Sequence, residues 1–111
     1  MDIDEQRQGA VTILKPRGPL GASDAQILRD RLSTLAGTNL GRLALDLSAT
    51  PFVDSSGLEA LADAAEQLSQ SGQSLKICGA NETLREVFDL TGLAPMFEHF
   101  EDTNAAVRSF L

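Results

Sequence analysis

The feature that most constrains the fold is a short apolar run that leads, after a loop, into an amphipathic helical pattern. The run Leu43–Leu47 is mostly apolar, as expected for a strand that is buried on both faces of a sheet. Beyond the loop, apolar residues recur at the spacing of one helix face, at Leu58, Leu61, Ala62, Ala65 and Leu68. A buried strand followed by such a helix is typical of α/β domains.

Two neighbouring hydroxyl groups lie where this helix is expected to begin. Ser55 and Ser56 stand between Asp54 and Gly57. Unpaired backbone N–H groups and the helix dipole favour negative charge at a helix N-terminus. A serine at this position is therefore a favourable place to carry a phosphate group. Ser56 and Glu59 also fit a capping box with Ser56 as the N-cap, and both roles are compatible in the unphosphorylated chain.

The rest of the chain alternates between short strand-like runs and helical patterns. The first helix is expected to open with a capping pattern at Ser23-Asp24-Ala25-Gln26 and to end between Gly37 and Asn39. Pro16 indicates a sheet edge or a bulge. The further elements expected are strands over Ile3–Gln8, Val11–Arg17, Ser74–Cys78 and Met96–Phe100, a helix from Ser56 to about Ser71, and helices capped by Asn81 and by Asp102 or Thr103.

These elements predict one α/β domain over residues 1–111, with a mixed central sheet of about four to five strands and about four helices. Within it, Leu84, Val87, Phe88 and Leu90 are expected to face inward from the Asn81 helix.

Composition excludes several functional classes. The net charge of −7, without a Lys/Arg run, argues against nucleic-acid binding. The single cysteine, Cys78, cannot form an internal disulfide, which favours a reducing cytoplasm, and we expect it to be a small core side chain. No apolar stretch has the length of a membrane span, and the first residues, Met1–Glu5, are acidic rather than signal-like.

The sequence offers little for catalysis or for a cofactor. A serine hydrolase would need a general base and an oxyanion hole, and the chain has one histidine, His99, and no Gly-x-Ser-x-Gly motif. His99 is expected on the surface of the last strand, and Asp46 is expected to accept backbone N–H groups from the next loop. Neither a phosphate-binding glycine loop nor a metal-ligand cluster is present. We therefore expect no enzyme activity, no cofactor and no metal.

Three local patterns occur in a characteristic order along nearly the whole chain. They are Gly18-Pro19-Leu20 before the first helix, Asp46-Leu47-Ser48 followed by Phe52-Val53-Asp54-Ser55-Ser56-Gly57-Leu58, and Leu75-Lys76-Ile77-Cys78-Gly79 followed by the run from Leu84 to Leu93. In this order and spacing they resemble the STAS domain of bacterial anti-sigma factor antagonists.

The resemblance implies a binding module that is switched by phosphorylation. In that family a partner serine kinase, itself the anti-sigma factor, phosphorylates the hydroxyl residue at the start of the helix, and a phosphatase removes the phosphate. The unphosphorylated domain binds the kinase and frees the sigma factor. The resemblance places the phosphate on Ser56, with Ser55 as the alternative. We expect the protein to be a monomer and to be located in the cytoplasm. The partner is expected to contact Asp54, Ser55, Ser56, Gly57, Leu58, Glu59, Gly21 and Asp24.

Some positions depart from the family pattern. Gly21 stands where the family has an aspartate, with Asp24 three residues further on, and Glu59 stands where a small residue is usual. The Glu59 carboxylate would repel a phosphate in the first helical turn. Gly57 is expected to leave room for an approaching active site, and Leu58 to stay partly exposed as an apolar anchor. A STAS subunit of a lipid-transport ATPase or of a stress-sensing complex is the alternative function.

Overall fold

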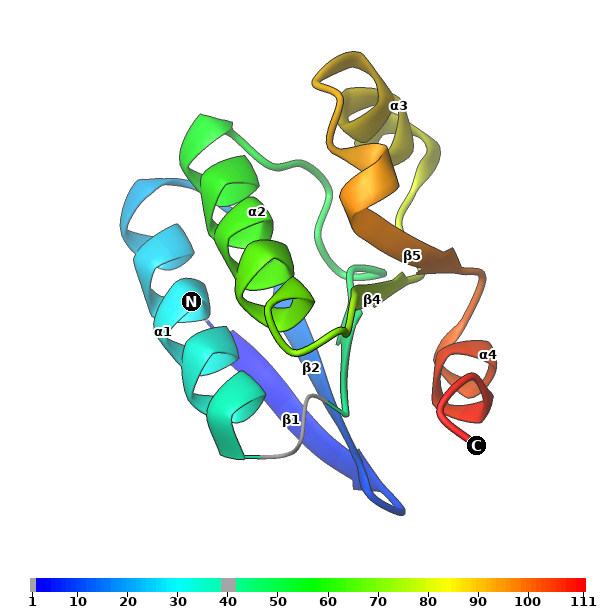
Figure 1. The fold of residues 1–111 in the computed structure, drawn as a ribbon. Helices are drawn as coiled ribbons and strands as arrows, with labels where there is room; N and C mark the ends of the chain where they lie inside the picture. The colour runs from blue at the N-terminus through cyan, green and yellow to red at the C-terminus, as the bar shows by residue number, and fades with distance from the viewer. Residues whose placement is uncertain (1, 39–41) are drawn as a thin grey trace.

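The computed structural model describes residues 2–38 and 42–111, which form a five-stranded sheet with helices on both faces (Figure 1). The strands lie in the order β1-β2-β3-β4-β5. Strand β1 is antiparallel to β2, and the other pairs are parallel. The elements in chain order are β1 (Asp2–Gln8), β2 (Val11–Arg17), α1 (Ala22–Thr38), β3 (Leu43–Asp46), α2 (Ser55–Ser69), β4 (Leu75–Cys78), α3 (Glu82–Leu90), the 3-10 turn η1 (Ala94–Met96), β5 (Phe97–Phe100) and α4 (Thr103–Arg108).

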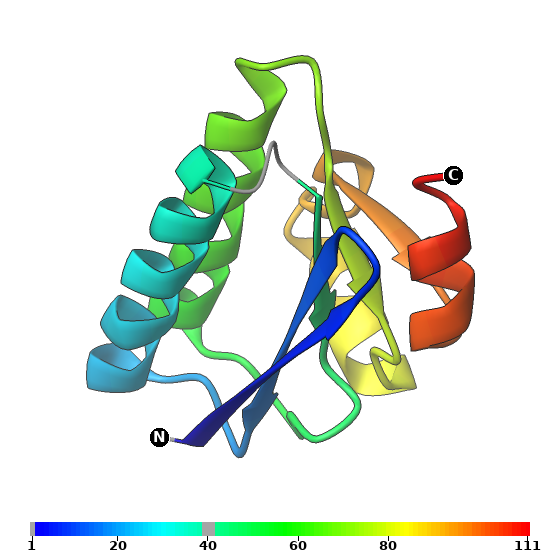
Figure 2. The same ribbon diagram turned by 90° about the horizontal axis from the view of Figure 1, so that it is seen from below.

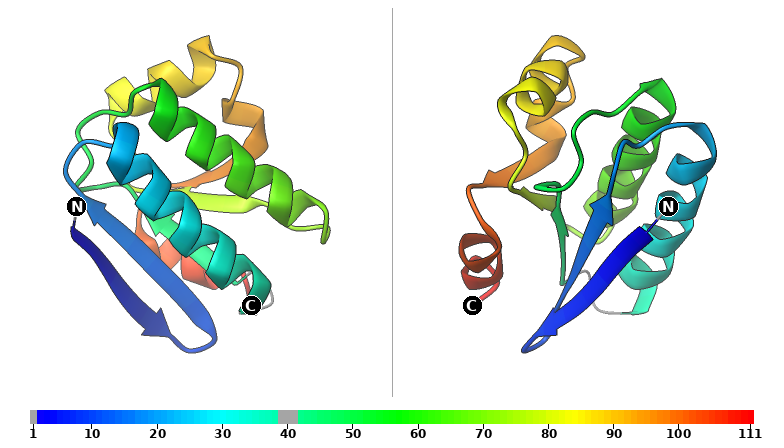
Figure 3. Two further views of the ribbon diagram at one scale, coloured as in Figure 1. Left: turned by 90° about the vertical axis from the view of Figure 1, so that its left-hand side faces the viewer. Right: turned by 180° about the vertical axis from the view of Figure 1, so that it is seen from behind.

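The sheet separates two apolar clusters of unequal size. Helices α1 and α2 run side by side on one face, and α4 lies on the other (Figures 2 and 3). The larger cluster joins α1, α2 and α3 to the sheet, and its large buried side chains include Phe88, Leu14, Leu28, Leu32, Leu45, Leu61, Ile77 and Leu84. The smaller cluster contains Val11, Ile13, Ala44, Cys78 and Ala106 beneath α4. Both faces of the parallel strands are therefore covered, which explains their nearly continuous apolar sequences.

Most of the predicted elements are confirmed within one or two residues. The strand Val11–Arg17 has the predicted bounds, and Asn81 and Asp102 are the N-caps of α3 and α4. Pro16 lies beyond the part of β2 that pairs with β3, which is residues 12–14, so its missing N–H costs no bond to that neighbour. Cys78 is buried, as expected.

Some details of the helices differ from the predictions. Helix α1 begins at Ala22, and the Ala25 N–H donates to the Gly21 carbonyl oxygen at 2.9 Å, so Ser23 lies inside the first turn rather than at the N-cap. The predicted end at Asn39 lies outside the described residues. Leu90, expected to face inward, is 80% exposed because the apolar stripe of α3 ends at Phe88. Within residues 2–38 and 42–111, no helix is long and apolar enough to cross a membrane.

The buried face of α2 is wider than the predicted stripe. Leu61, Ala65 and Leu68 are buried as expected, and Gly57, Ala60 and Ala64 are buried with them. Ala62 lies at the margin of this face and is half-buried. Four of the buried residues are small: Gly57, Ala60, Ala64 and Ala65. They allow α2 to lie close both to the sheet and to α1, because little side-chain volume separates the backbones.

Candidate functional site

Two loops that are far apart in sequence meet at the start of α2. Leu20, before α1, and Val53, before α2, form a parallel β-bridge. The Leu20 N–H donates to the Phe52 carbonyl oxygen at 3.1 Å, and the Asp54 N–H donates to the Leu20 carbonyl oxygen at 3.0 Å. The bridge explains why the Gly18–Asp24 segment lies beside the start of α2, as the predicted partner-binding surface requires.

A third loop braces the same edge of the sheet. The Asn81 side-chain amide donates to the Pro51 carbonyl oxygen at 3.2 Å, and the Thr50 hydroxyl donates to the Pro16 carbonyl oxygen at 3.1 Å. These segments follow strands β2, β3 and β4, whose carboxyl ends lie at one edge of the parallel sheet, where α/β proteins commonly bind their ligands. The loop before α2 is therefore held by hydrogen bonds on two sides.

Asp54, rather than Ser56, is the N-cap of α2. Its Oδ1 accepts the Gly57 N–H at 3.0 Å, and its backbone is extended, with φ −90° and ψ −173°. The predicted capping box of Ser56 with Glu59 is therefore wrong, because the N-cap lies two residues earlier, at Asp54, and Ser56 is inside the first turn. Asp54 thus has a structural role at the start of the helix.

The two serines occupy the first two positions of the helix but differ in exposure. Ser55 is exposed and Ser56 is half-buried. Both lie in the turn whose N–H groups have no partner within the helix. Glu59 is also exposed, one helical turn further along. The site therefore presents an exposed serine, a second, half-buried serine, and an exposed glutamate nearby.

Gly57 is required by internal packing. A Cβ atom at this position would lie 2.4 Å from Val53 Cγ1 and 2.8 Å from the Leu20 carbonyl oxygen. Gly57 is buried, so the expectation that it leaves space for an approaching active site is wrong. The missing side chain instead allows α2 to start directly against the Leu20–Val53 bridge.

Gly21 lies beside the capping carboxylate. A Cβ atom at residue 21 would be 3.0 Å from Asp54 Oδ2. The aspartate that the family pattern places here would therefore bring a second carboxyl group close to Asp54. Asp24 lies in the first turn of α1 and is half-buried. The carboxylate beside residue 21 is thus that of Asp54, which belongs to the loop before α2.

The exposed apolar side chain next to the serines is Phe52. Its side chain is 54% exposed, although its backbone is hydrogen-bonded to Leu20. Leu58 is partly exposed, as expected, and its buried part packs against the larger core cluster. The sequence could have indicated that Phe52 is exposed. Neighbouring residues of an extended segment point to opposite sides, so Phe52 faces outward when Val53 faces the core.

The remaining candidate residues have structural surroundings. Asp46 Oδ1 accepts the Ser48 N–H at 2.9 Å, as predicted for the strand end. His99 is half-buried rather than on the surface: its ring lies 6.1 Å from the rings of both Phe88 and Phe97, and its Nε2 is 3.3 Å from the Ala94 carbonyl oxygen. The histidine thus packs among α3, η1 and β5. In the described part of the chain, no group of three or more His, Cys, Asp or Glu side chains is arranged to hold a metal ion.

Comparison with known proteins agrees with this geometry. The model of the STAS domain family matches residues 2–106. The chain belongs to the STAS domain family. It is 28% identical over 94 residues to BtrV of Bordetella bronchiseptica, a protein named as an anti-sigma factor antagonist, and the match covers 85% of this chain and 81% of BtrV.

Three solved structures have the same fold. A crystal structure from Thermotoga maritima, described as an anti-sigma factor antagonist, has a TM-score of 0.86 at 21% identity and covers 96% of this chain and 92% of that one. The anti-sigma factor antagonist SpoIIAA in its unphosphorylated form has a TM-score of 0.78 at 18% identity, covering 98% and 96%. SpoIIAA of Bacillus in its phosphorylated form has a TM-score of 0.72 at 19% identity, covering 97% and 99%.

Proposed function

We propose that this chain is an anti-sigma factor antagonist that is switched by serine phosphorylation at the start of α2. In its unphosphorylated form it binds an anti-sigma factor that is also a serine kinase, and the sigma factor is released. Phosphorylation by that kinase ends the binding, and a cognate phosphatase restores it. The observation that supports this proposal most directly is the exposed hydroxyl of Ser55 at the N-terminus of a helix, on a loop braced by Leu20 and Asn81.

Exposure supports Ser55 ahead of Ser56 as the phosphate acceptor. A kinase must bring the hydroxyl into its own active site, and Ser55 is exposed whereas Ser56 is half-buried. The sequence alone favoured Ser56, with Ser55 as the alternative. With α2 beginning at Ser55, both serines remain in the first turn, where a phosphate is favoured, so accessibility is the property that separates them.

The added phosphate is expected to disrupt binding without unfolding the domain. It carries a charge of roughly −1.5 to −2. At an exposed helix N-terminus an anion is favoured by roughly 0.3–1 kcal/mol, although Glu59 reduces this benefit. In a closed protein interface, an unpaired charge costs on the order of 2–5 kcal/mol, which exceeds a tenfold loss of affinity. The switch therefore acts at the interface.

The binding surface is centred on Ser55 and includes the neighbouring loop before α1. It contains the exposed residues Asp54, Ser55 and Glu59, half-buried Ser56, and Gly21 and Asp24 across the bridge. Phe52 supplies the apolar contact, because it is the exposed aromatic side chain on the same braced loop. Aromatic residues are common among the side chains that dominate binding energy in interfaces. Gly57 and Leu58 support this surface from below.

The test is capture of partner proteins from the native host by the purified chain, with identification by mass spectrometry. Wild type and the double variant Ser55→Ala/Ser56→Ala should capture the same kinase, and Ser55→Asp should capture much less of it. Ser33→Asp is the matched control, because it places the same charge on an exposed serine of α1, and it should bind as wild type does. Phe52→Ala should lower binding by about tenfold or more while leaving the circular dichroism spectrum unchanged.

The two serines are separated by incubating each single alanine variant with the captured kinase and ATP. Ser55→Ala should abolish phosphate incorporation, and Ser56→Ala should retain it. Incorporation into Ser55→Ala but not into Ser56→Ala would reverse this assignment and keep the switch. Equal binding by Ser55→Asp and wild type, together with no phosphopeptide that covers the two serines, would exclude the switch and favour constitutive binding.

A further inference from the structure

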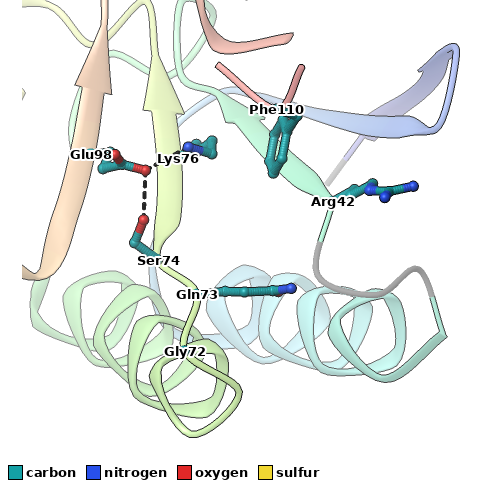
Figure 4. A pocket seen from close by; sticks show the side chains of 7 residues that line it. All are labelled: Arg42, Gly72, Gln73, Ser74, Lys76, Glu98 and Phe110. Carbon is teal, nitrogen blue, oxygen red and sulfur yellow. Dashed lines mark hydrogen bonds and ion pairs between the residues drawn. The ribbon is translucent and has the colours of Figure 1, made fainter. Parts of the chain in front are cut away.

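A polar hollow lies at the end of the molecule opposite to Ser55. It has a volume of about 480 Å³ and is lined by Arg42, Gly72, Gln73, Ser74, Lys76, Glu98 and Phe110 (Figure 4). Helix α2 begins at Ser55 and ends at Ser69, just before Gly72. Because a helix rises 1.5 Å per residue, α2 is roughly 22 Å long, and Gly72 lies beyond its far end. This volume is within the range of small-molecule sites.

One of the residues that line the hollow is a buried lysine. Lys76 is only 9% exposed, and its Nζ is 2.6 Å from Glu98 Oε2 on the neighbouring strand. The Nζ also lies 4.7 Å from the centre of the Phe110 ring and 5.4 Å from that of Phe100. A buried ammonium group requires such partners, because taking a charge out of water is costly. Its position is therefore well defined before any ligand arrives.

The carboxylate that pairs with Lys76 is also held in place. The Ser74 hydroxyl donates to Glu98 Oε2 at 2.6 Å, the same oxygen that contacts Lys76 (Figure 4). The hydrogen bonds from Lys76 and Ser74 hold the pKa of Glu98 below its usual value. The register of β4 and β5 places Lys76 directly opposite Glu98. The ion pair therefore joins two adjacent strands of the sheet, β4 and β5.

The side chains around this ion pair combine positive charge with a flat apolar surface. The lining contains the basic side chains of Arg42 and Lys76 and the acidic side chain of Glu98, in a chain whose net charge is −7. In Figure 4 the Phe110 ring lies between Lys76 and Arg42, and Gln73 extends from the loop after α2. Guanidinium groups bind carboxylates and phosphates with paired hydrogen bonds. An aromatic ring packs well against another ring.

We propose that this hollow binds a small organic anion in which a carboxylate or a phosphate is attached to a flat ring. The anionic group lies against Arg42, and the ring packs against Phe110. Lys76, which is paired with Glu98, adds positive charge on the other side of the Phe110 ring. Gln73 and Ser74 supply further polar contacts at the rim. The hollow is separate from the proposed phosphorylation site, because none of its lining residues lies at the start of α2.

The test is a titration of the whole, ¹⁵N-labelled chain, followed by amide chemical shifts. The probes are phenyl phosphate and benzoate, which distinguish the two anionic groups, with benzyl alcohol as the uncharged probe and inorganic phosphate as the probe without a ring. We expect saturable shifts at Gln73, Ser74 and Lys76 with at least one of the two ring anions. Benzyl alcohol and inorganic phosphate should each bind at least about tenfold more weakly, because each lacks one half of the interaction.

Two variants form a matched pair. Arg42→Gln removes a positive charge at the hollow, and Arg85→Gln removes one from the exposed surface of α3. Arg42→Gln should weaken the preferred ring anion by about fivefold or more, and Arg85→Gln should leave its affinity unchanged. Arg42 is exposed, so the variant is expected to fold, and its amide spectrum verifies this.

Several outcomes would overturn the proposal. One is the absence of a saturable shift with either ring anion up to about 10 mM. Equal binding of benzyl alcohol would show that only the apolar surface of the hollow matters. Equal weakening by Arg42→Gln and Arg85→Gln would show that the anions respond to overall charge rather than to this site.

Discussion

At the scale of single residues, Gly57 has a function that its small size alone explains. Gly57→Ala would place a Cβ 2.4 Å from Val53 Cγ1 and 2.8 Å from the Leu20 carbonyl oxygen. We expect a loss of about 1–3 kcal/mol in the free energy of unfolding, because the bridge must shift to make room. Gly37→Ala in α1 is the control, since nothing lies within 4 Å of its added Cβ. That control should be neutral or stabilising by up to about 1 kcal/mol in urea denaturation.

Asp54 has two assigned roles at the residue scale, and one pair of variants separates them. As the N-cap it accepts the Gly57 N–H at 3.0 Å, so Asp54→Ala should cost about 0.5–2 kcal/mol of stability. Asp54→Asn should retain most of that stability, because asparagine caps a helix equally well. If both variants unfold at the same urea concentration as wild type, the capping bond contributes nothing measurable. Reduced kinase binding by a stable Asp54→Asn would show that the charge itself matters.

At the scale of elements, the buried face of α2 connects the site to the core. Leu61 is fully buried, so Leu61→Asp would place an unpaired charge in the larger cluster and should cost more than about 4 kcal/mol. Leu90→Asp on α3 makes the same change at a side chain that is 80% exposed, and it should change stability by less than about 0.5 kcal/mol. Thermal unfolding followed by circular dichroism measures both. An unchanged melting temperature for Leu61→Asp would contradict the packing of α2.

At the scale of the whole molecule, acid stability depends on ion pairs that join different strands. The hydrogen bonds of Glu98 with Lys76 and Ser74 lower its pKa from the usual 4.5. A group whose pKa is lowered by folding stabilises the protein above that usual value, and this contribution is lost as the pH falls through the lower folded-state pKa. Glu98→Gln should therefore be less stable than wild type at neutral pH, and the difference should shrink below about pH 4.5.

Urea denaturation of both proteins across pH 3–7 measures this dependence, and it concerns the whole sheet because Lys76 and Glu98 lie on adjacent strands, β4 and β5. Glu101→Gln, at an exposed carboxylate after β5, serves as the control and should follow the wild-type curve. A constant difference between wild type and Glu98→Gln over the whole range would mean that the ionised form of Glu98 does not stabilise the fold.

The pattern of residues along the chain was sufficient to predict the order and type of the strands and the four α-helices, but not the 3-10 turn η1. Period-two and helical spacings report burial locally, which is why Val11–Arg17 and the Asn81 and Asp102 caps are as predicted. The site could be located for the same reason, since Asp54-Ser55-Ser56-Gly57 follows a buried strand. What local pattern could not supply was the surroundings of each residue: the Leu20–Val53 bridge decides that Gly57 is buried and that Phe52 is exposed. The register of β4 and β5 likewise decides that Lys76 meets Glu98. Contacts between segments distant in sequence depend on how the whole chain packs, so only the tertiary structure determines them.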